Sequence, residues 1–141
     1  MAMRESGVPE ASVAPGAAVA VEETAQLIAA GKVGGTPVYN RHAERLGTVE
    51  DVMLDKRSGR VAYAVMSFGG FLGIGERYHP LPWSMLNYDL DLGGYLVDLD
   101  RDRLEGAPSY AASDEVDWAD NNFGKRVSDY YGVRPYWAEV P

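Results

Sequence analysis

The sequence predicts a mainly β protein: a small β-barrel of five to six strands with a short closing helical turn, followed by a C-terminal helix. The first observation is a series of short runs, between residues 36 and 99, that are rich in β-branched and aromatic residues and separated by turn residues. The second is the length of 141 residues with 46% hydrophobic content, which suits one domain with a modest core. The third is a set of apolar residues at helical spacing near the C-terminus: Phe123, Val127, Tyr130 and Tyr131.

Composition divides the chain into four segments. Residues 1–21 are rich in Ala, Gly, Val and Pro without a clear period, which is typical of a flexible arm. Residues 22–35 form a lead-in segment, either two turns of helix or an extended stretch. We expect the barrel domain at residues 36–110 and an aromatic tail with a short helix at residues 111–141.

Five strands are expected in the barrel segment, at residues 38–39, 46–55, 61–68, 78–82 and 95–99, with the closing helical turn at 102–106. A hairpin joins the second and third strands, because the sequence at 56–59 is a turn in which Gly59 can take the positive φ that closes the loop. Pro80 and Pro82 cannot donate backbone hydrogen bonds, which places the fourth strand at an edge of the sheet.

The third strand and the aromatic tail both carry apolar surface that either the chain itself or another protein must cover. Seven of the eight residues at 61–68 are apolar, so both faces of this strand are covered, either by the chain itself or by another protein. The tail contains Trp118 and Trp137, two of the three tryptophans, and it either folds back on the barrel or docks on something else. Ser113 or Asp114 is expected to cap the helix of the tail, and Gly132 to end it.

Charge and composition exclude several classes of function. The net charge is -8, and residues 1–35, 36–110 and 111–141 carry -2, -3 and -3, so no basic patch for nucleic acid is expected. The chain has no cysteine, which excludes disulfides, thiolate metal sites, iron-sulfur clusters and thiol nucleophiles. The sequence contains no run of 18 consecutive apolar residues, so no transmembrane segment is expected. No secretory signal is expected either, and we therefore predict a cytoplasmic protein.

Two motifs resemble ligand sites but fail on spacing. The glycines at 69–75 do not match the dinucleotide fingerprint, because the position of its third glycine is Tyr78 in a strand. The acidic turn at 89–94 partly resembles a calcium loop, but strands flank it where helices are needed, and a polar turn is the better interpretation. Catalytic, cofactor-binding and metal-binding residues are therefore not expected, and no cofactor is predicted.

His79 is the remaining candidate for chemistry. It lies between Tyr78 and Pro80 in a strand, with Glu76 nearby, and a histidine there could titrate or bind a small molecule. No third partner completes a catalytic set, so we expect a structural role.

Several motifs taken together resemble the PRC-barrel domain family. They cover about residues 27–110 and lie at 35–40, 46–52, 68–76, 81–83 and 102–104. The resemblance implies a small β-barrel of the kind found in the cytoplasmic domain of the photosynthetic reaction-centre H subunit and in a ribosome-maturation factor. It also implies a docking fold without shared catalytic residues.

The sequence therefore predicts a non-catalytic protein-interaction module, an adaptor that binds a protein partner and self-associates as a homo-oligomer, with a dimer the simplest form. One alternative is an accessory factor of photosynthetic electron or proton transfer that uses Asp98, Asp100 and Asp102. Another is a small-molecule-binding or enzymatic barrel that uses His79, Glu76 and Tyr78. The candidate partner-binding residues are apolar or aromatic: Phe71, Leu72, Ile74, Trp118, Phe123, Tyr130, Tyr131, Tyr136 and Trp137.

Overall fold

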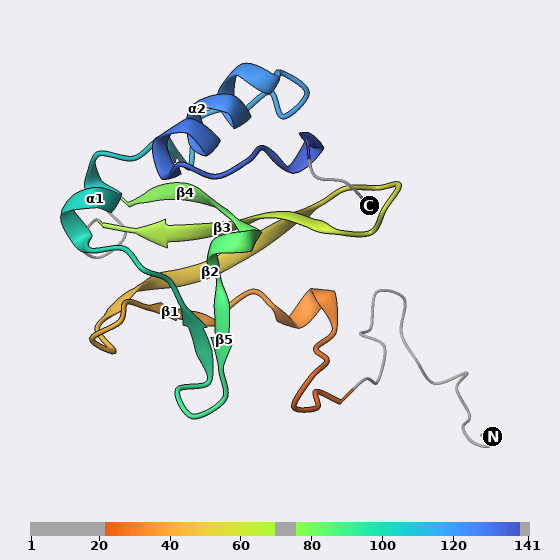
Figure 1. Ribbon diagram of the computed structural model, residues 1–141, viewed down its shortest axis with the longest axis vertical. Coiled ribbons are helices and arrows are strands. Elements are labelled where there is room, and N and C mark those ends of the chain that lie inside the picture. The colour runs from red at the N-terminus through yellow and green to blue at the C-terminus, as the bar shows by residue number, and fades with distance from the viewer. Residues whose placement is uncertain (1–21, 70–75, 139–141) are drawn as a thin grey trace.

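One sheet of seven strands forms the centre of the protein (Figure 1). The structure, a computed structural model, describes residues 22–69 and 76–138. The strand order is β5-β6-β1-β2-β3-β4-β7, and neighbouring strands are antiparallel except for the parallel pair of β1 and β6. The strands are β1 (Pro37–Tyr39), β2 (Arg45–Leu54), β3 (Val61–Phe68), β4 (Arg77–Pro82), β5 (Asn87–Asp89), β6 (Gly94–Leu96) and β7 (Tyr110–Ala111).

Two α-helices and three short 3-10 turns complete the described fold. They are α1 (Arg101–Glu105), α2 (Asn121–Tyr131), η2 (Ala30–Lys32), η3 (Trp83–Met85) and η4 (Tyr136–Ala138). Figure 1 shows α2 on the side of the sheet next to β4 and α1 at one end of the sheet. Within the described ranges, no helix combines the length and the apolar character that a membrane crossing requires.

The ends of α2 show one error and one success of the sequence prediction. The N-cap is Asp120, whose carboxylate accepts the N–H of Asn122, so the expected caps Ser113 and Asp114 are wrong. Asp114 instead accepts the N–H of Ala111 at 2.8 Å and holds the turn that follows β7. Gly132 ends the helix at φ 70, the left-handed conformation that glycine adopts without strain, as predicted.

The β2–β3 hairpin is the longest antiparallel pair and extends beyond the rest of the sheet (Figure 1). Its turn forms because the Asp55 carboxylate accepts the backbone N–H groups of Arg57 and Ser58 at 2.8 and 3.0 Å. Gly59 then closes the turn at φ 77. The predicted hairpin is therefore confirmed in its strands and in its turn.

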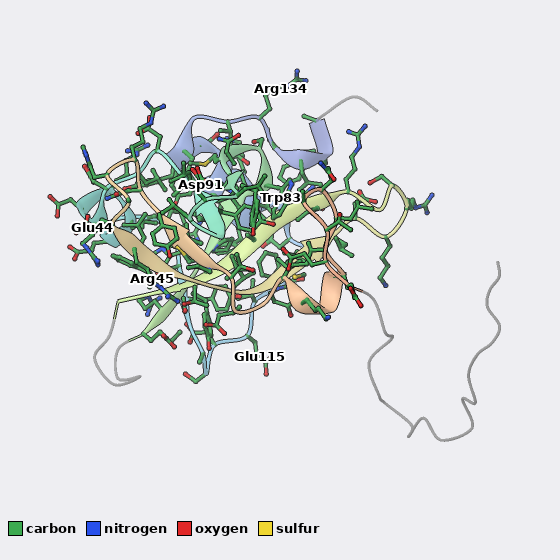
Figure 2. All side chains as sticks on the ribbon, turned by 90° about the horizontal axis from the view of Figure 1, so that it is seen from below. Glu44, Arg45, Trp83, Asp91, Glu115 and Arg134 are labelled. Carbon is green, nitrogen blue, oxygen red and sulfur yellow. The ribbon has the colours of Figure 1, made fainter. Side chains whose placement is uncertain are left out.

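The main core lies between the strands of the sheet and is closed by α1. Its fully buried side chains come from five elements: Val38 of β1, Val49 of β2, Met66 of β3, Leu81 of β4 and Leu104 of α1. Each such side chain stabilises the fold by roughly 1.5–3 kcal/mol. Charged side chains point outward, as Figure 2 shows for the labelled Glu44, Glu115 and Arg134.

The predicted mainly β fold is confirmed, but the barrel of five to six strands is wrong in two respects. The sheet has seven strands, because β5 and β7, of three and two residues, are present in addition to the five predicted strands. The sheet is also open, since β5 and β7 lie at the two ends of the strand order. Because β5 and β7 are so short, they offer few backbone groups that could pair with each other and close the sheet into a barrel.

Candidate functional site

The C-terminal segment, residues 112–138, covers the second face of β3. Along this strand Ala64, Met66 and Phe68 belong to the main core, whereas Tyr63 belongs to a second cluster. In that cluster Val127 of α2 is fully buried against the strand. The chain itself therefore covers this part of the doubly apolar third strand.

Most of the predicted aromatic residues meet around Tyr63. Its ring centroid lies 5.8 Å from Trp118 and 5.7 Å from Tyr136. Phe123 packs edge-to-face on Trp118 at 5.9 Å, and Trp137 packs on Tyr136 at 5.2 Å. Such pairs contribute about 0.5–1.5 kcal/mol each beyond simple burial. The aromatic tail is thus bound to its own sheet, with part of its surface still open.

Tyr130 and Tyr131 have a different role, at the contact between α2 and the rest of the fold. The Arg103 guanidinium of α1 lies over the Tyr130 ring, 4.5 Å from its centroid, and donates to the Tyr130 carbonyl. The Tyr130 hydroxyl donates in return to the Arg103 carbonyl at 2.6 Å. Tyr131 packs against both core clusters. These two tyrosines connect α2 to α1 and to the sheet.

The predicted loop residues Phe71, Leu72 and Ile74 lie outside the described residues. Their assignment as partner-binding residues stays a prediction.

Three adjoining pockets form a groove between the β2–β3 hairpin and the C-terminal segment, which we call the hairpin groove. Their volumes are about 150, 320 and 240 Å³, and all three are lined by Ala62 and Tyr136. The two larger pockets also contain Arg60 of the hairpin. The groove is therefore a continuous feature rather than an isolated cavity.

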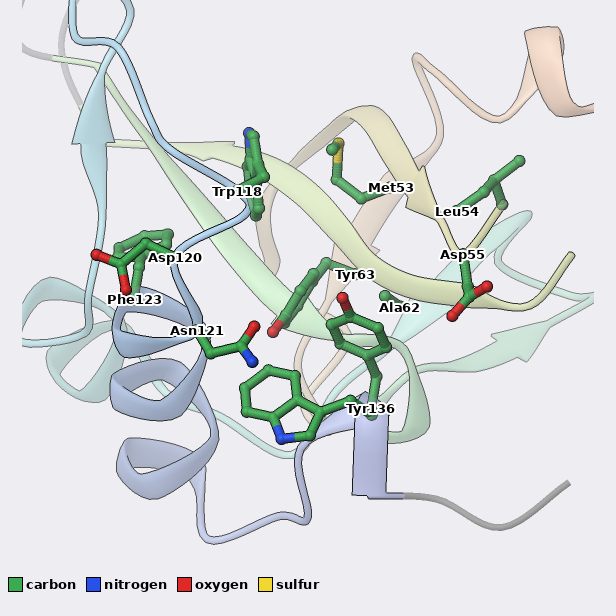
Figure 3. A pocket seen from close by; sticks show the side chains of 12 residues that line it. Met53, Leu54, Asp55, Ala62, Tyr63, Trp118, Asp120, Asn121, Phe123 and Tyr136 are labelled. Carbon is green, nitrogen blue, oxygen red and sulfur yellow. The ribbon is translucent and has the colours of Figure 1, made fainter. Parts of the chain in front are cut away.

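The smallest of the three, which we call the Tyr63 pocket, is the most aromatic (Figure 3). Leu54 and Trp137 line it and are 48% and 40% exposed. Apart from Trp137, its aromatic walls are Tyr63, Trp118, Phe123 and Tyr136.

Tyr63 lines this pocket and carries a buried polar atom without a partner. Its side chain is only 4% exposed, and its hydroxyl has no hydrogen-bond partner among the described residues. Figure 3 shows the ring between the strands and α2, with the hydroxyl pointing toward the helix that carries Asn121. Burial, with a smaller effect of Tyr136, raises the pKa of Tyr63 to about 12, so the hydroxyl is neutral at physiological pH.

Two carboxylates stand beside the aromatic walls. Asp55 comes from the hairpin turn and Asp120 from the N-cap of α2, and no basic side chain lines the Tyr63 pocket. The N–H groups of Ser58 and Arg57 lower the pKa of Asp55, which keeps this carboxylate charged. The pocket is therefore aromatic with an acidic border.

His79 is buried in the main sheet, away from the hairpin groove. It is 2% exposed, its ring packs edge-to-face on Phe68 at 5.4 Å, and its Nδ1 has no partner among the described residues. Burial, followed by the charge of Arg77, lowers the pKa of His79 to about 4. Tyr78 points to the opposite face of β4 and packs on Tyr110, so the structure does not bring Tyr78 and His79 together.

The aspartates singled out for proton transfer hold local structure. Asp100 caps α1 by accepting the N–H of Arg103 at 2.8 Å, and Asp98 forms an exposed ion pair with Arg41 at 3.3 Å. Asp102 lies exposed in the first turn of α1. In the calcium-like turn, Asp89 accepts two backbone N–H groups and forms the β5–β6 connection. Among the described residues, no group of three potential metal ligands is present.

A second apolar surface lies on the other side of the sheet, between the lead-in segment and β5. A pocket of about 330 Å³ is lined there by Leu27, Trp83 and Tyr88, and Leu27 is 73% exposed. Unlike the Tyr63 pocket, it has no buried unpartnered polar atom in its described lining.

Sequence reasoning missed the residues that the sheet contributes to the groove. Leu54, Asp55 and Tyr63 were predicted to lie in strands and not at a site. The available signal was the apolar character of both faces at 61–68, which indicated that Tyr63 would face a second layer.

These features define a small mainly β domain whose second face carries a helical layer and a groove. The PRC-barrel domain model matches residues 26–104, more than half of the chain, and the protein belongs to this family. The match confirms the resemblance carried by the motifs of the barrel segment.

Two individual comparisons accompany the family match. An uncharacterized protein of Deinococcus radiodurans is 26% identical over 78 residues, which are 55% of this chain and 27% of that protein. The chain thus spans about a quarter of the length of this relative. The crystal structure of RimM, a 16S ribosomal RNA processing protein of Pseudomonas aeruginosa, aligns with 20% identity and a TM-score of 0.34, over 67% of this chain and 50% of that one. At this TM-score the likeness supports no inference about the present chain.

Proposed function

We propose that this PRC-barrel protein is a non-catalytic protein-interaction module, an adaptor of the cytoplasm, that binds its partner in the hairpin groove. The observation that carries the proposal is the exposure of Leu54 and Trp137 on the two sides of the Tyr63 pocket. Large apolar side chains around a preformed pocket are typical anchors of protein interfaces.

The energetics of the groove are consistent with docking. Removing apolar surface from water contributes about 25 cal/mol per Å², so covering Leu54 and Trp137 together supports a measurable affinity. The C-terminal segment is already held by Val127 and by the contact between Arg103 and Tyr130. Because little ordering is then needed on binding, more of this energy remains available for affinity.

Self-association uses a different surface from the hairpin groove, formed by Phe71, Leu72 and Ile74. In the sequence these residues lie between β3 and β4, two of the strands that contribute to the main core. Apolar side chains on a loop between two such strands are suited to contact a second copy of the chain.

The test of the groove uses two serine variants and a matched control. In a pull-down from the native host, wild type and the double variant Leu54→Ser/Trp137→Ser are compared with Leu90→Ser, which removes another exposed leucine, from the β5–β6 turn. The proposal predicts that the double variant loses at least about tenfold of the specific partner signal, since two anchors are removed. Leu90→Ser is expected to retain it.

The result that would contradict the proposal is equal capture by wild type and the double variant. Loss of the partner with Leu90→Ser alone would also contradict it, because this would place docking at the β5–β6 turn. Circular dichroism and thermal unfolding of each variant verify that the fold is intact.

A further inference from the structure

We propose that the Tyr63 pocket binds the ammonium end of a lysine side chain that a basic partner protein presents. The inference rests on the proposed function, because it specifies the chemistry of the partner that the hairpin groove receives. Four properties of the pocket carry it: an unpartnered hydroxyl, aromatic walls, an acidic border and a small volume.

The hydroxyl of Tyr63 sets the first requirement. A buried hydroxyl without a partner is unfavourable, and here it belongs to a residue that lines a pocket and packs beside Gly124 of α2. The phenolic oxygen can accept a hydrogen bond, and an ammonium group offers three donors. An N–H donor from a ligand therefore satisfies an atom that the chain leaves unpaired.

The aromatic walls favour a cation over a neutral donor. Rings from β3, from the stretch before α2, and from η4 surround the space, including Tyr63, Trp118 and Tyr136. Aromatic faces attract ammonium groups through the negative charge density of the ring, most strongly for tryptophan. The same rings also cover the apolar methylenes of a lysine stem.

The acidic border adds charge complementarity. Asp55 and Asp120 each use one carboxylate oxygen, Oδ1, for backbone N–H groups of a turn or a helix end. The Ser58 side chain and the charge of Arg57 also act on Asp55, whereas no basic side chain lines the Tyr63 pocket itself. A positive group entering the pocket thus meets two carboxylates.

The volume limits the ligand to the end of one side chain. A cavity of about 150 Å³ accommodates a group of the size of benzene, which is comparable with the last part of a lysine. The pocket continues into the rest of the hairpin groove, where Leu54 and Trp137 can contact the backbone that carries the lysine.

The net charge decides between a basic partner and a second copy of the chain. The protein carries -8, and each third of the sequence is net negative. A second copy brings the same negative charge to the interface, whereas a basic protein is attracted over a distance. The occupant we infer is therefore a lysine-bearing partner of positive charge.

The experiment is an NMR titration of the full chain with two blocked tripeptides, acetyl-Gly-Lys-Gly-amide and its norleucine counterpart, followed at the tryptophan indole N–H signals. Norleucine keeps the methylenes and removes the charge. We expect the lysine peptide to bind at least about tenfold more tightly, and its effect to centre on Trp118 and Trp137.

Two pairs of variants test the residues. Asp55→Asn/Asp120→Asn removes the charges but keeps an acceptor oxygen for the turn and the cap, and is expected to weaken lysine binding about tenfold. Asp89→Asn is the matched control, because Asp89 holds a similar turn away from the pocket. Tyr63→Phe is expected to weaken binding about fivefold, whereas Tyr131→Phe, which removes another buried unpartnered hydroxyl, leaves it unchanged.

Three results would overturn the inference. Equal binding of the two peptides would show that charge is not recognised, and unchanged binding in Asp55→Asn/Asp120→Asn would show that the border is not used. A wild-type dimer that this variant dissociates in sedimentation would identify a second copy as the occupant. Each is distinguishable from failure of the proposed function, which is measured by the serine variants of Leu54 and Trp137.

Discussion

Two buried polar side chains, Tyr63 and His79, lie on neighbouring strands and illustrate different roles. Both have an atom without a partner among the described residues, and burial shifts both pKa values toward the neutral form. Tyr63 borders a pocket, where a ligand can supply the missing hydrogen bond. His79 packs on Phe68 in the sheet, and its buried imidazole has to be uncharged in the folded protein.

His79 is expected to make the protein less stable in mild acid. Its folded-state pKa of about 4 lies below the ordinary value of 6.5, so between these values the unfolded chain binds a proton that the folded chain excludes. Stability is complete above pH 6.5 and falls as the pH drops toward 4, by about 2 kcal/mol at pH 5. Urea unfolding at pH 7 and pH 5 measures this difference.

The control for this prediction is His79→Phe, which keeps a ring at the position and cannot titrate. Between pH 7 and pH 5, its free energy of unfolding is expected to fall by about 2 kcal/mol less than that of wild type. An identical pH dependence in the two proteins would show that His79 is not excluded from protonation by the fold.

At the scale of elements, the contact between α2 and β3 depends on Gly124. A Cβ at this position would lie 2.8 Å from the Tyr63 hydroxyl oxygen and 2.9 Å from the Trp137 ring. The glycine lowers the helix propensity of α2 but allows the helix to approach the sheet closely. The ring of Trp137 in η4 lies against the same glycine, and both residues line the Tyr63 pocket.

The variant Gly124→Ala is expected to destabilise the protein although alanine favours helix. Crowding of Tyr63 and Trp137 is expected to cost about 1–2 kcal/mol in the free energy of unfolding. Chemical unfolding followed by tryptophan fluorescence measures it, with Asn122→Ala on the exposed side of α2 as control. A more stable Gly124→Ala would contradict the close packing of α2.

The sequence predicted elements where periodicity and turn chemistry act locally. The β2–β3 hairpin and the end of α2 at Gly132 follow from glycine and aspartate preferences within a few residues. The cap of α2 was misplaced because Asp114 and Asp120 are chemically equivalent candidates, and only the turn after β7 assigns Asp114 to Ala111. The Tyr63 pocket could not be predicted, since it joins residues more than 50 positions apart.

At the scale of the whole molecule, the family could be recognised from the sequence, whereas the open form of the sheet could not. The sheet is open because β5 and β7 lie at its two ends, where β5 pairs with β6 and β7 pairs with β4. The predicted division into a barrel at residues 36–110 and a tail at residues 111–141 stays a prediction. Val127 and Tyr63 nevertheless share one core cluster across this boundary.

Self-association is a prediction for the whole molecule that concerns the loop between β3 and β4. The double variant Phe71→Ser/Leu72→Ser is expected to shift the protein from dimer to monomer, because it removes the apolar contacts of the proposed dimer interface. Sedimentation velocity measures the shift, and thermal unfolding verifies that the main core is retained. Wild type and variant that sediment alike would argue against this interface.

The central claim is that the hairpin groove is the docking surface of this protein. Amide hydrogen exchange of the full chain, measured with and without the purified partner, tests it most directly. Slower exchange on binding is expected at residues 53–62 and 118–138, on both sides of the groove. Slower exchange confined to residues 23–28 and 86–95, around the second apolar surface, would contradict it.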